Sequence, residues 1–155
     1  MQKKFMSEAI QLAHNGVNQS QGGPFGAVIV KENKIIGRGF NQVINNFDPT
    51  AHAEIVAIRE ACKYLNNFWL EGCEIYTNCE PCPMCLGAIY WAHLDKIFYA
   101  ADRGDAAKIG FDDSFFYDEL NKKMENRKIK MMQLMRDDAL VVFKEWENKQ
   151  DKIRY

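Results

Sequence analysis

The sequence predicts an α/β sandwich, in which helices cover both faces of a sheet, because strand patterns alternate with helix patterns along most of the chain. Apolar residues recur at intervals of three and four in several segments, as on the buried face of a helix. Runs of β-branched residues between turn signals indicate strands. With 155 residues, 47% of them apolar, the chain can bury a real core. We therefore expect one domain over residues 1–155.

The first two thirds of the chain divide clearly into elements. Phe5, Ala9 and Leu12 lie at helical spacing, and Asn15-Gly16 would end that helix. Glu32-Asn33-Lys34 is a polar turn between two apolar runs. In order, the expected elements are a helix over 5–15, strands over 26–31 and 35–43, a helix from 50 to 66–67, a strand over 73–78, a helix over 82–92 and a strand over 96–101.

The last third is less regular. Arg103 to Ser114 is rich in glycine, alanine and aspartate, which predicts a loop with a short helical turn. Phe115 to Lys122 suggests a helix, Ile129 to Leu134 a last strand, and Arg136 to Asn148 a terminal helix. Residues 150–155 form a charged tail, which would be a frayed terminus in most proteins.

Charge and composition limit the function. A net charge of −1 argues against a nucleic-acid binder, which normally has a basic face. No apolar run approaches the roughly 20 residues of a membrane span, and the N-terminus lacks the apolar stretch of a secretory signal. Five cysteines is an odd number, and thiolate ligands persist in a reducing compartment. We therefore expect a cytoplasmic protein.

Two short stretches carry the chemistry, and each should open a helix. The first contains His52 and Glu54 in Thr-Ala-His-Ala-Glu, and the second contains Cys82 and Cys85 in Glu-Pro-Cys-Pro-Met-Cys. Pro83 is tolerated in a first helical turn, and cysteines three apart face the same way. One histidine and two cysteines can hold one zinc ion and leave its fourth position open for water, as in catalytic sites. Glu54 can sit beside that water without being a ligand.

H-x-E followed by P-C-x-x-C is the signature of zinc-dependent nucleobase deaminases. Residues 23–30, Asn41 and residues 48–54 and 77–92 also resemble the cytidine deaminase superfamily. Gly-Phe-Asp-Asp-Ser-Phe at 110–115 and a final tyrosine narrow this resemblance to the small bacterial guanine deaminases. The resemblance implies a three-layer α/β/α sandwich around a five-stranded mixed sheet, one zinc ion per chain and a homodimer.

The implied reaction is hydrolysis of the free purine base guanine to xanthine and ammonia. Zinc lowers the pKa of a water molecule from about 15.7 towards roughly 7, and the resulting hydroxide attacks C2. Glu54 would take the water proton and pass it first to a ring nitrogen and then to the departing amine.

Other residues would choose the substrate. The resemblance assigns Asn41 to the base edge, and its amide offers a donor and an acceptor. Asp113, with Asp112 as the second choice, would accept guanine's N–H groups. Aromatic side chains could stack on the ring, although each could equally pack in the core; Phe47 is favoured because it lies just before the zinc helix. The resemblance also implies that the terminal tyrosine folds over the base as a lid, on its own subunit's site or on a partner's. The set expected around the base is Asn41, Asp113, Phe25, Phe47, Ala53, Trp91 and Tyr155.

Two other functions fit part of the pattern. A tRNA adenosine deaminase shares the zinc motif and the Gly-Pro-Phe-Gly-Ala-Val stretch, but it would need a basic RNA-facing surface that this sequence does not provide. A non-catalytic zinc domain used for assembly would explain the ligands but gives no reason for Glu54. A redox pair formed by Cys79 and Cys82 competes poorly, because Cys82 belongs to the metal pattern.

Overall fold

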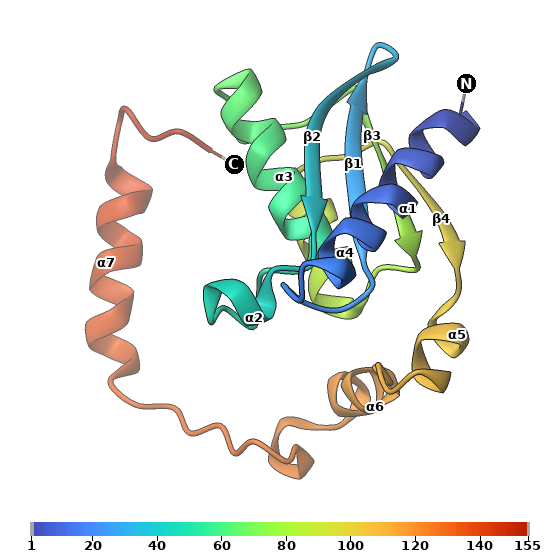
Figure 1. The fold of residues 1–155 in the computed structure, drawn as a ribbon. Helices are drawn as coiled ribbons and strands as arrows, with labels where there is room; N and C mark the ends of the chain where they lie inside the picture. The colour runs from blue at the N-terminus through green and yellow to red at the C-terminus, as the bar shows by residue number, and fades with distance from the viewer. Residues whose placement is uncertain (1, 155) are drawn as a thin grey trace. The chain divides into compact units, whose positions relative to one another are not determined.

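The computed structural model describes residues 2–154, in two compact units that divide between Asp113 and Ser114. Each unit is described by itself (Figure 1). Among residues 2–154, no helix is long and apolar enough to cross a membrane. The zinc motif and all the described candidate site residues belong to the first unit.

The first unit is built on a mixed sheet with strand order β2-β1-β3-β4. β1 pairs antiparallel with both β2 and β3, while β3 and β4 are parallel. The strands are β1 (Gly26–Lys31), β2 (Lys34–Phe40), β3 (Cys73–Cys79) and β4 (Lys96–Ala101). The four strands predicted in this part of the chain are therefore confirmed.

Helices cover both faces of this sheet, as the alternation along β1 requires. Val28 and Val30 share a core with Phe5 of α1 (Gln2–Asn18) on one face. Ala27 and Ile29 face the other way, into the core lined by two more helices. Those helices are α3 (Ala53–Leu65) and α4 (Pro83–Trp91), and α3 makes its main contacts with β2 (Figure 1). The predicted three-layer α/β/α sandwich is confirmed.

Several boundaries differ from those expected. α1 continues through Gly16 to Asn18, and other differences lie close to the zinc motif. β2 ends at Phe40 rather than at Val43, so Asn41 lies just beyond the strand. The next residues form α2 (Val43–Asn46), a single turn that is too short to give a periodic signal. The expected helical turn after β4 is α5 (Arg103–Lys108).

The second unit contains α6 (Ser114–Asn121), the 3-10 turn η1 (Met124–Asn126) and α7 (Arg136–Asn148). The predicted strand from Ile129 to Leu134 is wrong, because these residues are irregular and the sheet has four strands rather than five. Ile129 and Leu134 are 80% and 79% exposed. A strand needs a neighbour for its N–H and C=O groups, and no strand lies among the described residues of this unit.

Candidate zinc and purine-base site

The three expected ligands are brought together by the starts of two helices. His52 is the N-cap residue of α3, and Cys82 is the N-cap residue of α4, with Pro83 in the first turn. His52 makes no capping hydrogen bond at the start of α3, and its Nδ1 faces the two cysteine sulfurs instead. Cys85 lies one turn into α4 and is fully buried.

The separations of the three side chains fit a tetrahedral zinc ion. His52 Nδ1 lies 3.6 Å from Cys82 Sγ and 3.5 Å from Cys85 Sγ, and all three ligand atoms lie within 4.8 Å of one another. Zn–N and Zn–S bonds of usual length at a tetrahedral angle place nitrogen and sulfur about 3.6 Å apart. One imidazole and two thiols are also the ligand chemistry that zinc prefers.

Shared hydrogen bonds couple the protonation of the three candidate ligands. The hydrogen bond from the Cys85 thiol, together with that to His52, lowers the pKa of Cys82 to about 4 against the cost of burial. The same Cys82–Cys85 bond, with burial, raises the pKa of Cys85. The opposite shifts describe one proton held between two sulfurs. The bond with Cys82 also raises the pKa of His52. Metal binding would release the protons that these bonds share, because zinc takes deprotonated cysteine and neutral histidine.

Glu54 lies in the first turn of α3 and is 6% exposed. Burial is the main cause that raises the pKa of its carboxyl group, and the Cys82 charge adds to it. A carboxyl group with a raised pKa can both take and give a proton near neutral pH. Because it lies beside the ligands rather than among them, Glu54 suits proton transfer.

Asn41 is 5% exposed and has a fixed orientation. Its Oδ1 accepts hydrogen bonds from the backbone N–H of Gly23 and that of Val43, both at 3.2 Å. A Cβ atom on Gly22 would overlap with Asn41, so the loop approaches this closely only with glycine there. Since both lone pairs of the oxygen are used, Nδ2 is the end of the amide that can meet a ligand.

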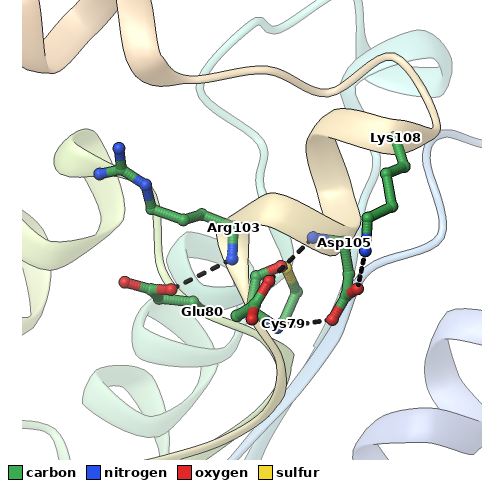
Figure 2. Close-up of polar contacts among 6 residues, drawn as sticks. Cys79, Glu80, Arg103, Asp105 and Lys108 are labelled. Atoms are coloured by element: carbon green, nitrogen blue, oxygen red, sulfur yellow. Dashed lines mark hydrogen bonds and ion pairs between the residues drawn. The ribbon is translucent and has the colours of Figure 1, made fainter.

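Asp113 is half-buried near the zinc ligands. Desolvation raises the pKa of its carboxyl group, the Arg103 charge opposes this rise and the Cys82 charge adds to it. The segment before Asp113 is fastened to the zinc loop by Glu80, whose carboxylate accepts the backbone N–H of Arg103 at 3.1 Å (Figure 2). Glu80 also donates its own N–H to Ala101, which extends the pairing of β3 with β4.

Figure 2 also shows how α5 is closed at its start. Asp102 accepts the backbone N–H of Asp105, Asp105 accepts that of Asp102, and Lys108 donates to Asp105. Cys79 donates to the Asp102 carbonyl, and burial is the main cause that raises its pKa to about 11. A neutral, buried thiol of this kind does not favour the redox interpretation of the Cys79–Cys82 pair.

The aromatic candidates fall in different places. Phe25 lies just before β1 and packs edge-to-face on Phe111, with ring centroids 4.9 Å apart. Phe47, at the end of α2, is 95% exposed in a left-handed conformation. Trp91 is the last residue of α4, roughly 13 Å along the helix axis from Cys82, and 69% exposed. The first unit therefore does not bring Trp91 to the zinc ligands.

The remaining two candidates are Ala53 and Tyr155. Ala53 is fully buried as the first residue of α3, between His52 and Glu54, and it packs against Gly39 of β2. Tyr155 lies outside the described residues.

Two residues close to the site had no role in the sequence analysis. Asn78 of β3 accepts the N–H of Gly26 at 2.8 Å and donates to the Pro24 carbonyl at 2.9 Å, which shapes the loop carrying Phe25. Phe111 forms the ring pair with Phe25. Their partners are about 50 and 86 residues away along the chain, and no local pattern could have indicated them.

The site as a whole defines a class of protein. Three ligands rather than four, with a buried carboxyl group beside them, are the arrangement of a catalytic zinc hydrolase rather than that of a structural zinc site. Known proteins narrow this class to one family. Residues 1–101 match the cytidine and deoxycytidylate deaminase zinc-binding region. The chain belongs to this deaminase family.

Individual relatives differ in how much of the chain they match. The guanine deaminase of Bacillus subtilis is 53% identical over 151 residues, which cover 97% of each chain. The X-ray structure of guanine deaminase from Bacillus subtilis has a TM-score of 0.96 with 52% identity, covering 99% of this chain and 98% of that one. A tRNA-specific adenosine deaminase of Aquifex aeolicus is 50% identical over 78 residues, half of this chain and 52% of that protein.

Proposed function

We propose that the protein hydrolyses guanine to xanthine and ammonia. The observation that carries this proposal is the similarity to the Bacillus subtilis guanine deaminase, which extends over 97% of the chain, together with the cluster of His52, Cys82 and Cys85. The match to the Aquifex aeolicus tRNA-specific enzyme covers half of the chain. Guanine is therefore the first candidate substrate and adenosine in tRNA is the second.

The chain's own residues divide the work as follows. His52, Cys82 and Cys85 would hold zinc, which supplies a Lewis acid that makes water more acidic. Glu54 takes a proton from the attacking water as the C2–O bond forms. It gives that proton to a ring nitrogen, then takes the second proton from the new C2 hydroxyl group and gives it to the amine as the C2–N bond breaks and the C2 carbonyl forms. The products are xanthine and ammonia, so the atoms of guanine and water are all accounted for.

Recognition of the base follows from two oriented polar groups. The Nδ2 amide of Asn41 is a donor and therefore meets an acceptor atom of the purine. Asp113 is an acceptor and meets the N1–H and 2-amino groups of guanine. Phe25 and Phe47 supply apolar surface for the ring faces. Ala53 contributes backbone close to Glu54. Trp91 lies at the far end of α4 from the ligands, so it is assigned no contact with the base.

The whole chain is proposed to act as one deaminase domain with a C-terminal lid. The full-length match to the Bacillus subtilis protein supports a common unit of function that includes residues 114–155. A homodimer is proposed because α7 presents a row of apolar side chains to solvent. These are Leu140, Val141, Val142, Phe143 and Trp146, between 39% and 69% exposed.

A cytoplasmic location is proposed from the cysteines. All five are free thiols, and none forms a disulfide. Thiolate ligands of a catalytic zinc ion persist in a reducing compartment, where disulfides are rare. Expression of a tagged chain followed by cell fractionation would test the location.

The first experiment measures ammonia release from guanine, guanosine, adenine, cytosine and cytidine by purified zinc-loaded protein. Guanine should be preferred, with xanthine detected by absorbance. If zinc-loaded protein released no ammonia from any of these compounds, the proposal would be contradicted. Formation of inosine in tRNA would then favour tRNA adenosine deamination.

Glu54→Gln gives the sharper mechanistic test. This variant should keep one zinc per chain and lose turnover by about 10²–10⁴-fold, since it keeps the shape of the side chain but cannot carry a proton. Full turnover in a zinc-loaded Glu54→Gln variant would sink the assigned mechanism. Glu32→Gln, at an exposed position in the turn between β1 and β2, is the matched control for the same exchange and should leave turnover unchanged.

A further inference from the structure

Phe25 and Phe111 join two segments that are far apart in sequence, and we call this pair the ring clasp. Their centroids are 4.9 Å apart and their planes meet at 88°, an edge-to-face contact that aromatic rings prefer. Phe25 precedes β1, and Phe111 follows α5. Neither ring belongs to the fully buried residues of the sheet core, and Phe111 is 45% exposed. Core filling alone therefore does not explain Phe111.

One side of the ring clasp leads to Asn41. Gly23 donates its N–H to Asn41 Oδ1 at 3.2 Å, which fixes the direction of the amide. A Cβ atom built on Gly23 would lie 2.9 Å from Phe111 Cζ and 3.0 Å from Phe25 Cε2. Both rings therefore lie against Gly23, the residue that orients Asn41.

The other side leads to Asp113, two residues after Phe111. Phe111 donates its backbone N–H to Ala106 of α5 at 3.0 Å, after a left-handed Gly110 with φ of 93°. α5 is itself fastened to the zinc loop through Glu80 and Arg103. The position of Asp113 is thus set by α5 on one side and by the Phe111 ring on the other.

We propose that Phe111 is a positioning residue that, through the ring clasp, sets the carboxylate of Asp113 against the amide of Asn41. The spacing between this acceptor and this donor would fix which base edge fits. The identity of the base in this proposal rests on the proposed function. The packing of the ring clasp involves only residues 22–25 and 110–113 and does not depend on the substrate. Phe111 acts through Asp113 and does not touch the reacting atoms.

The test is Phe111→Ala in zinc-loaded protein. KM for guanine should rise about tenfold, in line with the loss of an aromatic pair and its packing, while kcat stays within about threefold. Zinc content should remain one per chain. Phe68→Ala is the matched control, because Phe68 is 46% exposed and makes an edge contact with Trp69. This control should leave KM unchanged.

A double-variant cycle separates positioning from general packing. In an Asp113→Asn background, Phe111→Ala should change KM by less than about twofold, because the group that it positions is already altered. Additive effects in this cycle, loss of zinc, or an unchanged KM in the single variant would overturn the proposal. Gly23→Ala keeps both rings but crowds Phe111, and should reproduce the rise in KM.

Amide hydrogen exchange tests the ring clasp without depending on guanine turnover. Phe111→Ala should speed exchange at the amides of residues 109–113, and Phe68→Ala should not. If wild-type protein is inactive on guanine but this exchange changes as expected, the proposed function fails and the ring clasp stands. Unchanged exchange together with normal wild-type turnover rejects the ring clasp and leaves the function in place.

Discussion

The polarity of Asn41 is set by backbone groups around it rather than by its own chemistry. An amide can present either end to a ligand, but here both lone pairs of the oxygen are occupied by Gly23 and Val43. The resemblance to a family points to Asn41, but the sequence leaves open whether its donor or its acceptor meets the base. The structure resolves this, because the N–H of Gly23, 18 residues away along the chain, and that of the neighbouring Val43 both donate to the amide oxygen.

Asp113 should weaken the binding of guanine at low pH, which would give an acid limb in the pH profile of KM. Its pKa is raised above the usual 3.8, chiefly by desolvation, so the carboxyl group is protonated at a higher pH than a free aspartate. Protonation removes the acceptor for guanine's N–H groups. KM for guanine should therefore rise as pH falls through this raised pKa and be constant above it.

Kinetics of Asp113→Asn across the same pH range provide the check. The variant should have a raised KM at every pH, by about 5- to 150-fold for ~1–3 kcal/mol of unpaired polar group, and should lose the acid limb. If the limb persisted in Asp113→Asn, it would belong to another group.

At the scale of elements, α3 depends on the two glycines of β2 that let it lie close to the sheet. A Cβ atom on Gly39 would overlap with the Ala53 carbonyl and lie 2.6 Å from the Ala57 N. The obstacle is helix backbone, which cannot move aside as a flexible side chain could. Because Ala53 lies between His52 and Glu54, packing of β2 against α3 also places the site.

Gly39→Ala should lower the free energy of unfolding by about 1–3 kcal/mol or more and reduce zinc occupancy. Gly87→Ala in α4 is the control: nothing lies within 4 Å of the added Cβ, and helix propensity should raise stability by up to about 1 kcal/mol. Urea unfolding and metal analysis of both variants would check this. Equal stability of the two variants would contradict it.

The elements also show what could be predicted from the sequence. α3 and α4 were predictable because apolar spacing and, in α4, a first-turn proline are local signals, although α3 begins at Ala53 rather than at Thr50. The metal ligands were predictable for the same reason, since Cys82 and Cys85 lie one turn apart. The strand at 129–134 was wrong because strand formation needs a partner, and partners are not visible in a local pattern.

At the scale of the whole molecule, the exposed apolar row of α7 should support the proposed homodimer. Phe143 is 69% exposed, and Phe143→Lys should shift the protein towards monomer in sedimentation velocity because it places a charge in an apolar contact. Lys144→Ala changes a neighbouring exposed residue and should leave association unchanged. A dimer that survives Phe143→Lys unaltered would place the contact elsewhere.

The role proposed for the tail beyond α7 as a lid can be tested by deletion. Deletion of Arg154 and Tyr155 should reduce turnover of guanine if this tail closes over a bound base, as lids commonly exclude water. Zinc content should not change, because the ligands lie in the first unit. Undiminished turnover after the deletion would make the tail a frayed terminus.

The exposed, left-handed Phe47 offers a way to follow occupancy of the site by limited proteolysis. A 95% exposed phenylalanine after a one-turn helix is an open target for a chymotrypsin-like protease, since such proteases cut exposed loops after large aromatic residues. If the ring folds onto a bound purine, the chain should be nicked after Phe47 quickly on its own and slowly in the presence of a non-hydrolysable base. The rate of one cleavage would then report occupancy of the site without any turnover.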